Sequence, residues 1–335
     1  MALVPMRLLV DEAAKGNYAL GAYNVNNMEQ IQAIMAAARE TKSPVIIQAS
    51  RGALKYSNFN YLRHIMLAAV EENPDIPIAM HLDHGNSLET CKKAISLDFT
   101  SVMIDGSLKE DSKTPTTFEE NLEVTLSVIE YARPLGVSVE AELGTLGGIE
   151  DGVGSGRVNL TDPDQAVEFV EKTKVDALAV AIGTSHGAYK FKDEPKLALN
   201  LVKEIHGRLP DTALVMHGSS SVPQYLVDMV NKYGGNMPNA RGVPMSAIQS
   251  VIPYGVRKVN IDTDGRMAVT AAIRKVFVET PEKFDPRDYL GPARTALTEL
   301  VTQKMKDLGT AGHAGDFEQK SLEDMKEFYR KKGLL

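Results

Sequence analysis

Eight short, mostly apolar segments alternate with longer segments of helical periodicity along the 335-residue chain. Strands that are apolar throughout, rather than at every second residue, are typical of parallel sheets covered by helices on both faces. The expected strands lie at residues 18–25, 44–50, 76–84, 101–107, 137–144, 177–183, 213–219 and 256–264. An eightfold alternation of this kind predicts an α/β protein with a closed (β/α)8 barrel, the TIM barrel.

A doubly wound open sheet is the main alternative for an alternating pattern, and it often binds a dinucleotide at its first strand–helix turn. The corresponding turn here, YNVNNMEQ, has no glycine fingerprint for such a ligand. Beyond the eighth strand the chain continues as a last barrel helix and further helices, without a break in composition. We therefore predict a single domain over residues 1–335, with a C-terminal helical appendage from about 280 to 335.

The charge balance and the cysteine content restrict the partners and the compartment. A net charge of −7 argues against nucleic acid or an anionic membrane as the main partner. Cys91 is the only cysteine, so no internal disulfide can form, which favours a reducing cytoplasm. The first sixteen residues are interrupted by Arg7 and Asp11, unlike a signal peptide, and no apolar stretch approaches the length of a membrane span. The sequence thus predicts a soluble, cytoplasmic protein.

Polar or ionisable side chains stand at the C-terminal end of nearly every expected strand, whereas the strand starts are unremarkable. In a barrel these ends form one face, and active sites form there. The residues at the ends are Asn24, Ser50, Asp83 with His84, Asp105, Glu140 with Glu142, His186, His217, and Asn260 with Asp262. A local structural cluster could explain one such end but not eight, so this face is the predicted functional site.

Three of the seven histidines, His84, His186 and His217, lie at or just beyond the third, sixth and seventh strands. Neutral imidazoles that converge on one face suit a divalent transition metal, with zinc first, and three protein ligands leave a coordination position for a substrate. His81, two residues before Asp83, fits either support of this site or simple packing, and we leave both interpretations open.

Glycine- and serine-rich turns follow the sixth and seventh strands. Gly187 and Gly218 come directly after two of the expected metal ligands, and Ser219–Ser221 add hydroxyl donors. Glycine allows close approach of an anion to the backbone, and a helix N-terminus favours negative charge. The loops after the last two strands are also the usual phosphate position of a barrel. These turns therefore predict a phosphate-binding site, although a plain helix start is the alternative.

The segment after the fifth strand, GTLGGIEDGVGSG at 144–156, contains six glycines and carries Glu150 near its middle. Glycine-rich loops at a catalytic face often act as lids. A carboxylate that a lid brings over a bound substrate is a usable proton acceptor. Glu150 is accordingly a candidate catalytic residue.

Long motifs of the chain resemble the class II, metal-dependent fructose-1,6-bisphosphate aldolases. The resemblance runs in register over essentially the whole chain, from GAYNVNNMEQ to FDPRDYLGP, through HLDHG, VSVEAELGTLGGIED, AVAIGTSHGAYKF, VMHGSSSVP and VRKVNIDTDGRMA. It implies a (β/α)8 barrel that reversibly cleaves fructose 1,6-bisphosphate to dihydroxyacetone phosphate and glyceraldehyde 3-phosphate through a zinc-stabilised enediolate.

The resemblance also implies roles for individual residues. It gives the Zn²⁺ ligands as His84, His186 and His217. It makes Asp83 the acid/base for the C4 hydroxyl proton and Glu150 the lid carboxylate that exchanges the C3 proton of dihydroxyacetone phosphate. The implied substrate contacts are Asn24, Ser50, Gly187, Gly218, Ser220, Asn260, Asp262 and Thr263, of which Gly187, Gly218, Ser220 and Thr263 bind one phosphate.

Several accessory features are implied as well. Arg287 corresponds to an arginine that reaches the other phosphate from a neighbouring subunit, which implies a homodimer or a higher homo-oligomer. Asp105 and Glu142 correspond to acids near an alternative metal position. A monovalent cation, Na⁺ or K⁺, is implied near the phosphate loops.

Other chemistries remain as alternatives. The serine-rich HGSSS differs from the HGGSG of another branch of the family, and the resemblance places the chain in the branch that includes the tagatose-bisphosphate aldolases. The resemblance implies alanine at position 219 in the tagatose-specific group, so Ser219 favours fructose bisphosphate. Sedoheptulose bisphosphate is a further alternative. A lysine Schiff base is disfavoured because Lys258, early in the eighth strand, is the only lysine within an expected strand. A zinc-dependent barrel hydrolase usually has an HxH pair on its first strand, which is absent here. A catalytically silent phosphate-binding or scaffold protein is a further alternative, but it would not require Asp83 and Glu150 to accompany the expected metal ligands.

Overall fold

The computed structural model describes residues 2–148, 158–189, 197–318 and 320–335. Its eight strands are all parallel and form one closed barrel in sequence order, with β1 paired to both β2 and β8. The strands are β1 Leu20–Asn24, β2 Val45–Ser50, β3 Ile78–Gly85, β4 Ser101–Ile104, β5 Ser138–Leu143, β6 Ala177–Val180, β7 Ala213–Met216 and β8 Val256–Ile261. The predicted TIM barrel is confirmed.

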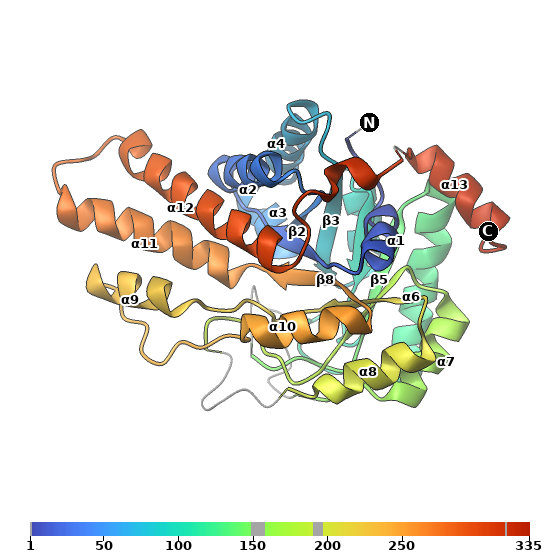
Figure 1. Ribbon diagram of the computed structural model, residues 1–335. Helices are drawn as coiled ribbons and strands as arrows, with labels where there is room; N and C mark the ends of the chain where they lie inside the picture. Colours follow the sequence, from blue (N-terminus) through green and yellow to red (C-terminus); the bar gives the residue numbers. More distant parts are fainter. Residues whose placement is uncertain (1, 149–157, 190–196, 319) are drawn as a thin grey trace.

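Helices surround this barrel on all sides (Figure 1). They are α1 Met6–Gly16, α2 Met28–Thr41, α3 Arg51–Ser57, α4 Phe59–Glu71, α5 Leu88–Ile95, α6 Phe118–Ala132, α7 Pro163–Thr173, α8 Leu199–Arg208, α9 Gln224–Lys232, α10 Met245–Val251, α11 Thr263–Glu279, α12 Pro286–Asp307 and α13 Leu322–Lys331. The main apolar core lies between the strands and these helices. Among the described helices, none is long and apolar enough to cross a membrane.

Local sequence signals account for several helix boundaries. Ser87 caps α5 by accepting a hydrogen bond from the Thr90 amide, as its position before the helix predicts. The helix expected around 59–72 is α4, and a further short helix, α3, fills the segment between β2 and α4. Asn58 separates the two helices at a φ of 66° and caps α4. Asparagine adopts a positive φ more readily than most residues, and its side chain accepts a hydrogen bond from the Asn60 amide, so it can end one helix and begin the next.

The N-terminal segment closes the end of the barrel that is formed by the N-terminal ends of the strands. Apolar side chains of α1, among them Leu9 and Val10, pack with inward-facing residues of the strands in a second core cluster. Arg7 on α1 forms salt bridges with Asp11 and, across the barrel end, with Asp176. The charges that distinguish this segment from a signal peptide thus bind it to the barrel, which leaves the C-terminal end of the strands as the open face.

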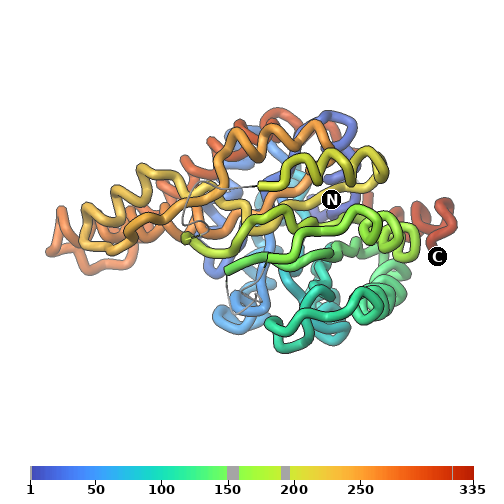
Figure 2. The backbone as a smooth tube through the Cα atoms, turned by 90° about the horizontal axis from the view of Figure 1, so that it is seen from below, coloured from blue at the N-terminus to red at the C-terminus, as the bar shows by residue number. Residues whose placement is uncertain are grey.

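Two long helices extend beyond the barrel. α11 and α12 lie side by side and project to one side of the molecule in both views (Figures 1 and 2). The second half of α12 nevertheless belongs to the main core through Leu297, Leu300 and Val301. The division between barrel and appendage therefore stays a prediction, because α12 is part of both the projecting arm and the common core.

Candidate metal centre and active site

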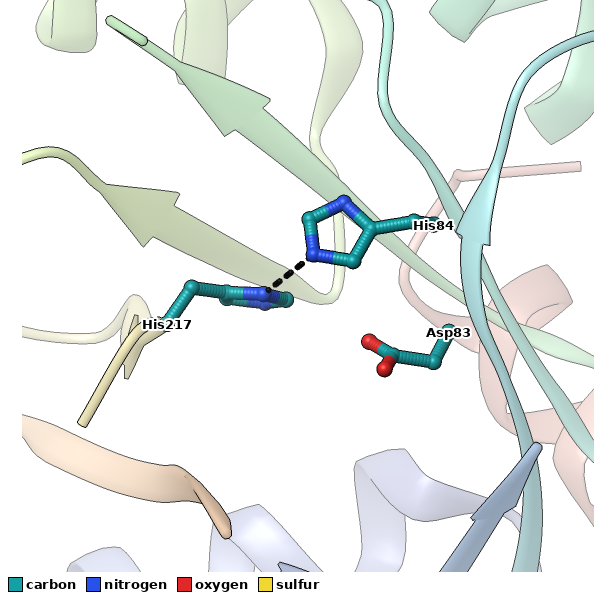
Figure 3. Close-up of side chains that lie close together, drawn as sticks. All are labelled: Asp83, His84 and His217. Atoms are coloured by element: carbon teal, nitrogen blue, oxygen red, sulfur yellow. Dashed lines mark hydrogen bonds between the residues drawn. The ribbon is translucent and has the colours of Figure 1, made fainter. Parts of the chain in front are cut away.

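Asp83 and His84 are neighbours in sequence, yet both point into the mouth of the barrel. Successive residues of a regular strand point to opposite faces. The pairing of β3 with β4 shifts register between Leu82 and Gly85, and His84 has a φ of 50°, in the left-handed region. A bulge re-aims side chains, and a strained backbone of this kind clusters at functional sites. This bulge allows both side chains to face His217 at the end of β7 (Figure 3).

Two histidine nitrogens meet at the centre of this site. Nε2 of His84 lies 3.0 Å from Nδ1 of His217, as the dashed line in Figure 3 shows. On their far sides, each ring contacts a carboxylate: Nδ1 of His84 is 3.0 Å from Asp105, and Nε2 of His217 is 2.7 Å from Glu140. A carboxylate only accepts hydrogen bonds when ionised, so each far nitrogen carries a proton. Carboxylate–histidine pairs of this kind orient metal ligands in proteins.

The two rings differ in their affinity for a second proton. Burial disfavours a charged His84, but the carboxylates of Asp83 and Asp105 outweigh it and raise the pKa of His84 to about 10. Burial, together with the charges of His84 and Lys258, holds the pKa of His217 well below its usual range. The proton between the facing nitrogens is therefore on Nε2 of His84, which donates it to Nδ1 of His217. A cation that replaces this proton meets two lone pairs.

The geometry of these donors fits a metal ion. Ligand atoms of Asp83, His84 and His217 all lie within 4.8 Å of one another, and all three residues are buried. Two nitrogens bound to one tetrahedral zinc are about 3.3 Å apart, which is close to the separation found here. The set of two imidazoles and a carboxylate suits zinc and related transition metals.

His186 borders this group of ligand atoms. Its ring centroid lies 5.1 Å from that of His84, in an edge-to-face arrangement. Among the described residues, the group within 4.8 Å contains Asp83 rather than His186. The assignment of His186 as the third histidine ligand stays a prediction, and the structure places its ring next to that of His84.

A shell of amides holds the carboxylate of Asp83. Asn24 and Gln48 donate to Oδ2 over 2.9 and 3.3 Å, and Asn260 donates to Oδ1 over 3.1 Å. Burial opposes the charge of Asp83, but His84, His217 and Lys258, together with the hydrogen bond from Asn24, lower its pKa overall. Asp83 is thus an ionised proton acceptor that side chains from β1, β2 and β8 hold in one orientation.

Asp105 and Glu142 form a second possible cation group with His84. Burial, followed by the charge of Asp105, raises the pKa of Glu142 well above its usual range. One of its oxygens, Oε2, is buried without a hydrogen-bond partner among the described residues. The structure thus brings together the two acids that we expect near an alternative metal position.

The predicted phosphate residues gather beside the histidines. Gly187 and Gly218 have φ values of 83° and 59°. A Cβ on Gly218 would stand 2.7 Å from the carbonyl oxygen of Ser185, so only glycine fits there. The Oγ of Ser220 accepts a hydrogen bond from the Asp262 amide over 3.2 Å, which links the loop after β7 to the end of β8.

Three further predicted contacts have structural partners. Ser50 caps α3 and accepts a hydrogen bond from the Ala53 amide. Asp262 forms a salt bridge with Arg266, and Thr263 is the first residue of α11. Substrate roles for these residues remain predictions.

One predicted residue lies outside this cluster in the described part of the chain. Arg287 is in the first turn of α12, on the projecting arm, with 89% of its side chain exposed and its guanidinium paired with Asp285. This location is compatible with a role in another subunit. Glu150 lies outside the described residues.

Sequence reasoning missed three supporting residues. In the sequence Glu140 is only a polar residue at a strand end, but in the structure it binds His217. Gln48 binds both Asn24 and Asp83. Lys258, in the sequence only a possible nucleophile, pairs with Glu140. All three are completely buried. The available signal was a polar side chain inside an otherwise apolar strand, because such a residue is buried only with a partner.

The buried ion pair of Lys304 and Asp264 fastens the loop after β7. Lys304 on α12 lies 2.9 Å from Asp264 and donates to Oγ of Ser221 over 2.6 Å. Asp264 also accepts from the amides of Ser221 and Val222. This network anchors the segment that carries Gly218 and Ser220.

We expect Lys304→Met to lower the free energy of unfolding by about 3–5 kcal/mol, because it leaves a buried carboxylate without its counter-charge. Urea denaturation followed by circular dichroism measures this effect. Lys306→Met is the matched control, since Lys306 is on the same helix but exposed. Equal stability of the two variants would contradict the expectation.

The fold and the clustered histidines and acids define a barrel with a candidate metal site at the C-terminal ends of its strands. Comparison with known proteins gives its family. The family model described as "Fructose-bisphosphate aldolase class-II" matches residues 4–313. The chain is 58% identical over 332 residues to a fructose-bisphosphate aldolase of Giardia intestinalis, covering 98% of this chain and all of that one. It is 56% identical over 346 residues to one of Nostoc commune, covering 99% and 96% of the two chains.

A solved structure agrees with these relatives. The YdjI aldolase of Escherichia coli K12 superimposes with a TM-score of 0.74 at 30% identity, over 93% of this chain and 99% of that chain. The chain therefore belongs to the class II fructose-bisphosphate aldolase family. It is an aldolase, a carbon–carbon lyase of a family that is metal-dependent in general.

Proposed function

We propose that this aldolase cleaves fructose 1,6-bisphosphate reversibly, with Zn²⁺ as its metal and Asp83 as its acid/base. The observation that supports this most is the meeting of His84 and His217 beside an ionised Asp83, each ring backed by a carboxylate. His84, His186 and His217 would hold the ion. When bound, zinc supplies a Lewis acid that stabilises the negative charge left beside a carbonyl when a carbon–carbon bond breaks.

Asp83 would take the proton of the C4 hydroxyl as the bond between C3 and C4 breaks. Its carboxylate suits this task because it is ionised, buried, and held by amides from three strands. Glu150, on the loop after β5, would deliver a proton to C3 of the three-carbon fragment. In condensation the same two residues act in the reverse order.

Phosphate groups at both ends of the substrate would set its position. Gly187, Gly218, Ser220 and Thr263 would bind one phosphate, with a monovalent cation, Na⁺ or K⁺, nearby. Asn24, Ser50, Asn260 and Asp262 would contact the sugar. Binding energy at such remote groups aligns the reacting carbons. Asp105 and Glu142 would serve an alternative position of the metal. The single cysteine, Cys91, is buried and supports a cytoplasmic enzyme.

A coupled assay that compares fructose, tagatose and sedoheptulose bisphosphates tests the substrate assignment. We expect the highest kcat/KM for fructose 1,6-bisphosphate, because Ser219 stands where the tagatose-specific enzymes are expected to have alanine. A higher value for either of the other two sugars would reject fructose as the preferred substrate.

Arg287 is proposed to reach the second phosphate in the site of a partner subunit, within a homodimer or larger assembly. Its exposure on the projecting arm supports this role. We expect Arg287→Ala to raise KM about 10- to 100-fold, since a hydrogen bond to a charged group contributes roughly 1.5–3 kcal/mol.

Hybrid dimers test the exchange of Arg287 directly. Arg287→Ala co-expressed with Asp83→Asn is expected to recover about a quarter of wild-type activity at low substrate concentration. Half of randomly formed dimers contain one subunit of each variant. In such a dimer, one of the two sites combines the intact Asp83 of one subunit with the intact Arg287 of the other. An activity equal to the average of the two variants alone would show that Arg287 acts in its own subunit or not at all.

A further inference from the structure

A fully buried ion pair lies directly beneath the proposed metal ligands. Nζ of Lys258 is 3.0 Å from Oε2 of Glu140, and neither side chain is exposed. Lys258 also donates to Oδ1 of Asn260 over 2.8 Å. Burying a charged pair is costly, so it is weak evidence for stability alone. Its position between β5 and β8, in contact with two site residues, points to another role.

Lysine has three donors and no acceptor, so it determines which way its partners face. Oδ1 of Asn260 must point to Lys258, and the NH₂ group of Asn260 must then point away from it. That group donates to Asp83 over 3.1 Å. Without a donor at Lys258, the amide of Asn260 could turn and present its oxygen to the Asp83 carboxylate.

Lys258 acts on His217 through Glu140 in the same way. Oε2 of Glu140 is directed to Lys258, and Oε1 contacts Nε2 of His217 over 2.7 Å. Since an ionised carboxylate only accepts, the proton of His217 is on Nε2. Nδ1, the atom that faces His84, is thereby left with its lone pair.

We propose that Lys258 is a positioning residue of the metal site. Its ammonium orients Glu140 and Asn260 together, and through them it sets the tautomer of His217 and the donor that holds Asp83. This inference rests on the proposed function, because it takes His217 as a ligand and Asp83 as the base. It also assigns a role to Lys258 other than the Schiff-base nucleophile considered above.

Zinc affinity tests this role without relying on activity. We expect Lys258→Met to weaken Zn²⁺ binding about 10- to 100-fold, the usual effect of losing a partner that orients a ligand. Competition with a chromophoric chelator measures the dissociation constant. The visible absorption of the Co²⁺-loaded protein is expected to shift, because it reports ligand geometry. Arg7→Met is the matched control: it also removes a paired, largely buried cation, but one on α1 at the opposite end of the barrel from the metal ligands.

A second variant excludes a simple folding defect. Lys258→Met combined with Glu140→Gln leaves no unpaired buried charge, and the glutamine can either donate to or accept from His217. We expect it to fold and still to bind zinc at least tenfold more weakly. Binding within twofold of wild type, with an unchanged Co²⁺ spectrum, would overturn the proposal.

The wild-type protein offers a further test that needs no variant. In the zinc-loaded protein the ¹⁵N shifts of the histidine rings are expected to show His217 protonated on Nε2, and protonation on Nδ1 would refute the proposal. Failure of the wild-type protein to bind zinc would instead reject the proposed function.

Discussion

Removal of divalent cations is expected to abolish cleavage of fructose 1,6-bisphosphate, and added Zn²⁺ is expected to restore it. Cleavage next to a carbonyl leaves negative charge, and a Lewis acid contributes several kcal/mol to its stabilisation. Each 1.36 kcal/mol changes the rate about tenfold, so we expect a loss of at least about 10³-fold. Dialysis against a chelator, followed by a coupled assay for the triose phosphates, measures the loss and the recovery.

Borohydride provides the complementary measurement for the metal prediction. Reduction in the presence of substrate traps a lysine Schiff base covalently, and mass spectrometry detects the added mass. We expect no adduct on Lys258, because its ammonium is completely buried and bound by Glu140 and Asn260. Activity that survives thorough metal removal, or a trapped lysine, would reject the proposed mechanism.

Asp83→Asn is expected to lower kcat about 10²- to 10⁴-fold, the usual contribution of a general acid–base group. Asparagine preserves the shape of the side chain and removes the charge that accepts the C4 hydroxyl proton. Zinc content is expected to stay near one ion per chain, because the three histidines are the proposed ligands. Steady-state kinetics and metal analysis measure the two quantities separately.

The same variant separates two roles that the geometry allows for Asp83, since its carboxylate also lies within the group of potential ligand atoms. Loss of zinc together with activity would make it a ligand, and unchanged turnover would remove it from catalysis. Asp98→Asn is the control. Asp98 is a half-exposed partner of Arg63 with a positive φ that asparagine tolerates, so this change is expected to leave both quantities unchanged.

The arrangement of strands could be predicted from the sequence because it follows from local patterns. Apolar segments such as ALAVAIG at 177–183 are typical of a covered parallel sheet, and an alternation of eight of them with helices predicts a closed barrel. The strand ends then share one face whatever the exact register. That topological constraint is why Asp83, His84 and His217 could be expected together from residues 133 positions apart.

The local backbone and the partners of each side chain required the tertiary structure. Nothing in HLDHG indicates that β3 bulges at His84, yet this bulge alone turns adjacent residues to the same side. Likewise, Glu140, Gln48 and Lys258 appear in sequence as isolated polar residues in apolar strands. Their roles depend on contacts between strands distant along the chain, which no local pattern encodes.

The amino-acid order by itself determined the barrel, its active-site face and the chemical types of residue gathered there, because periodicity and strand direction are local properties. Only the folded chain decided which nitrogen faces which, since a hydrogen-bond direction depends on both partners. In this protein, buried Lys258 and the carboxylates around His84 and His217 determine these directions. The carboxylates are those of Asp83, Asp105, Glu140 and Glu142.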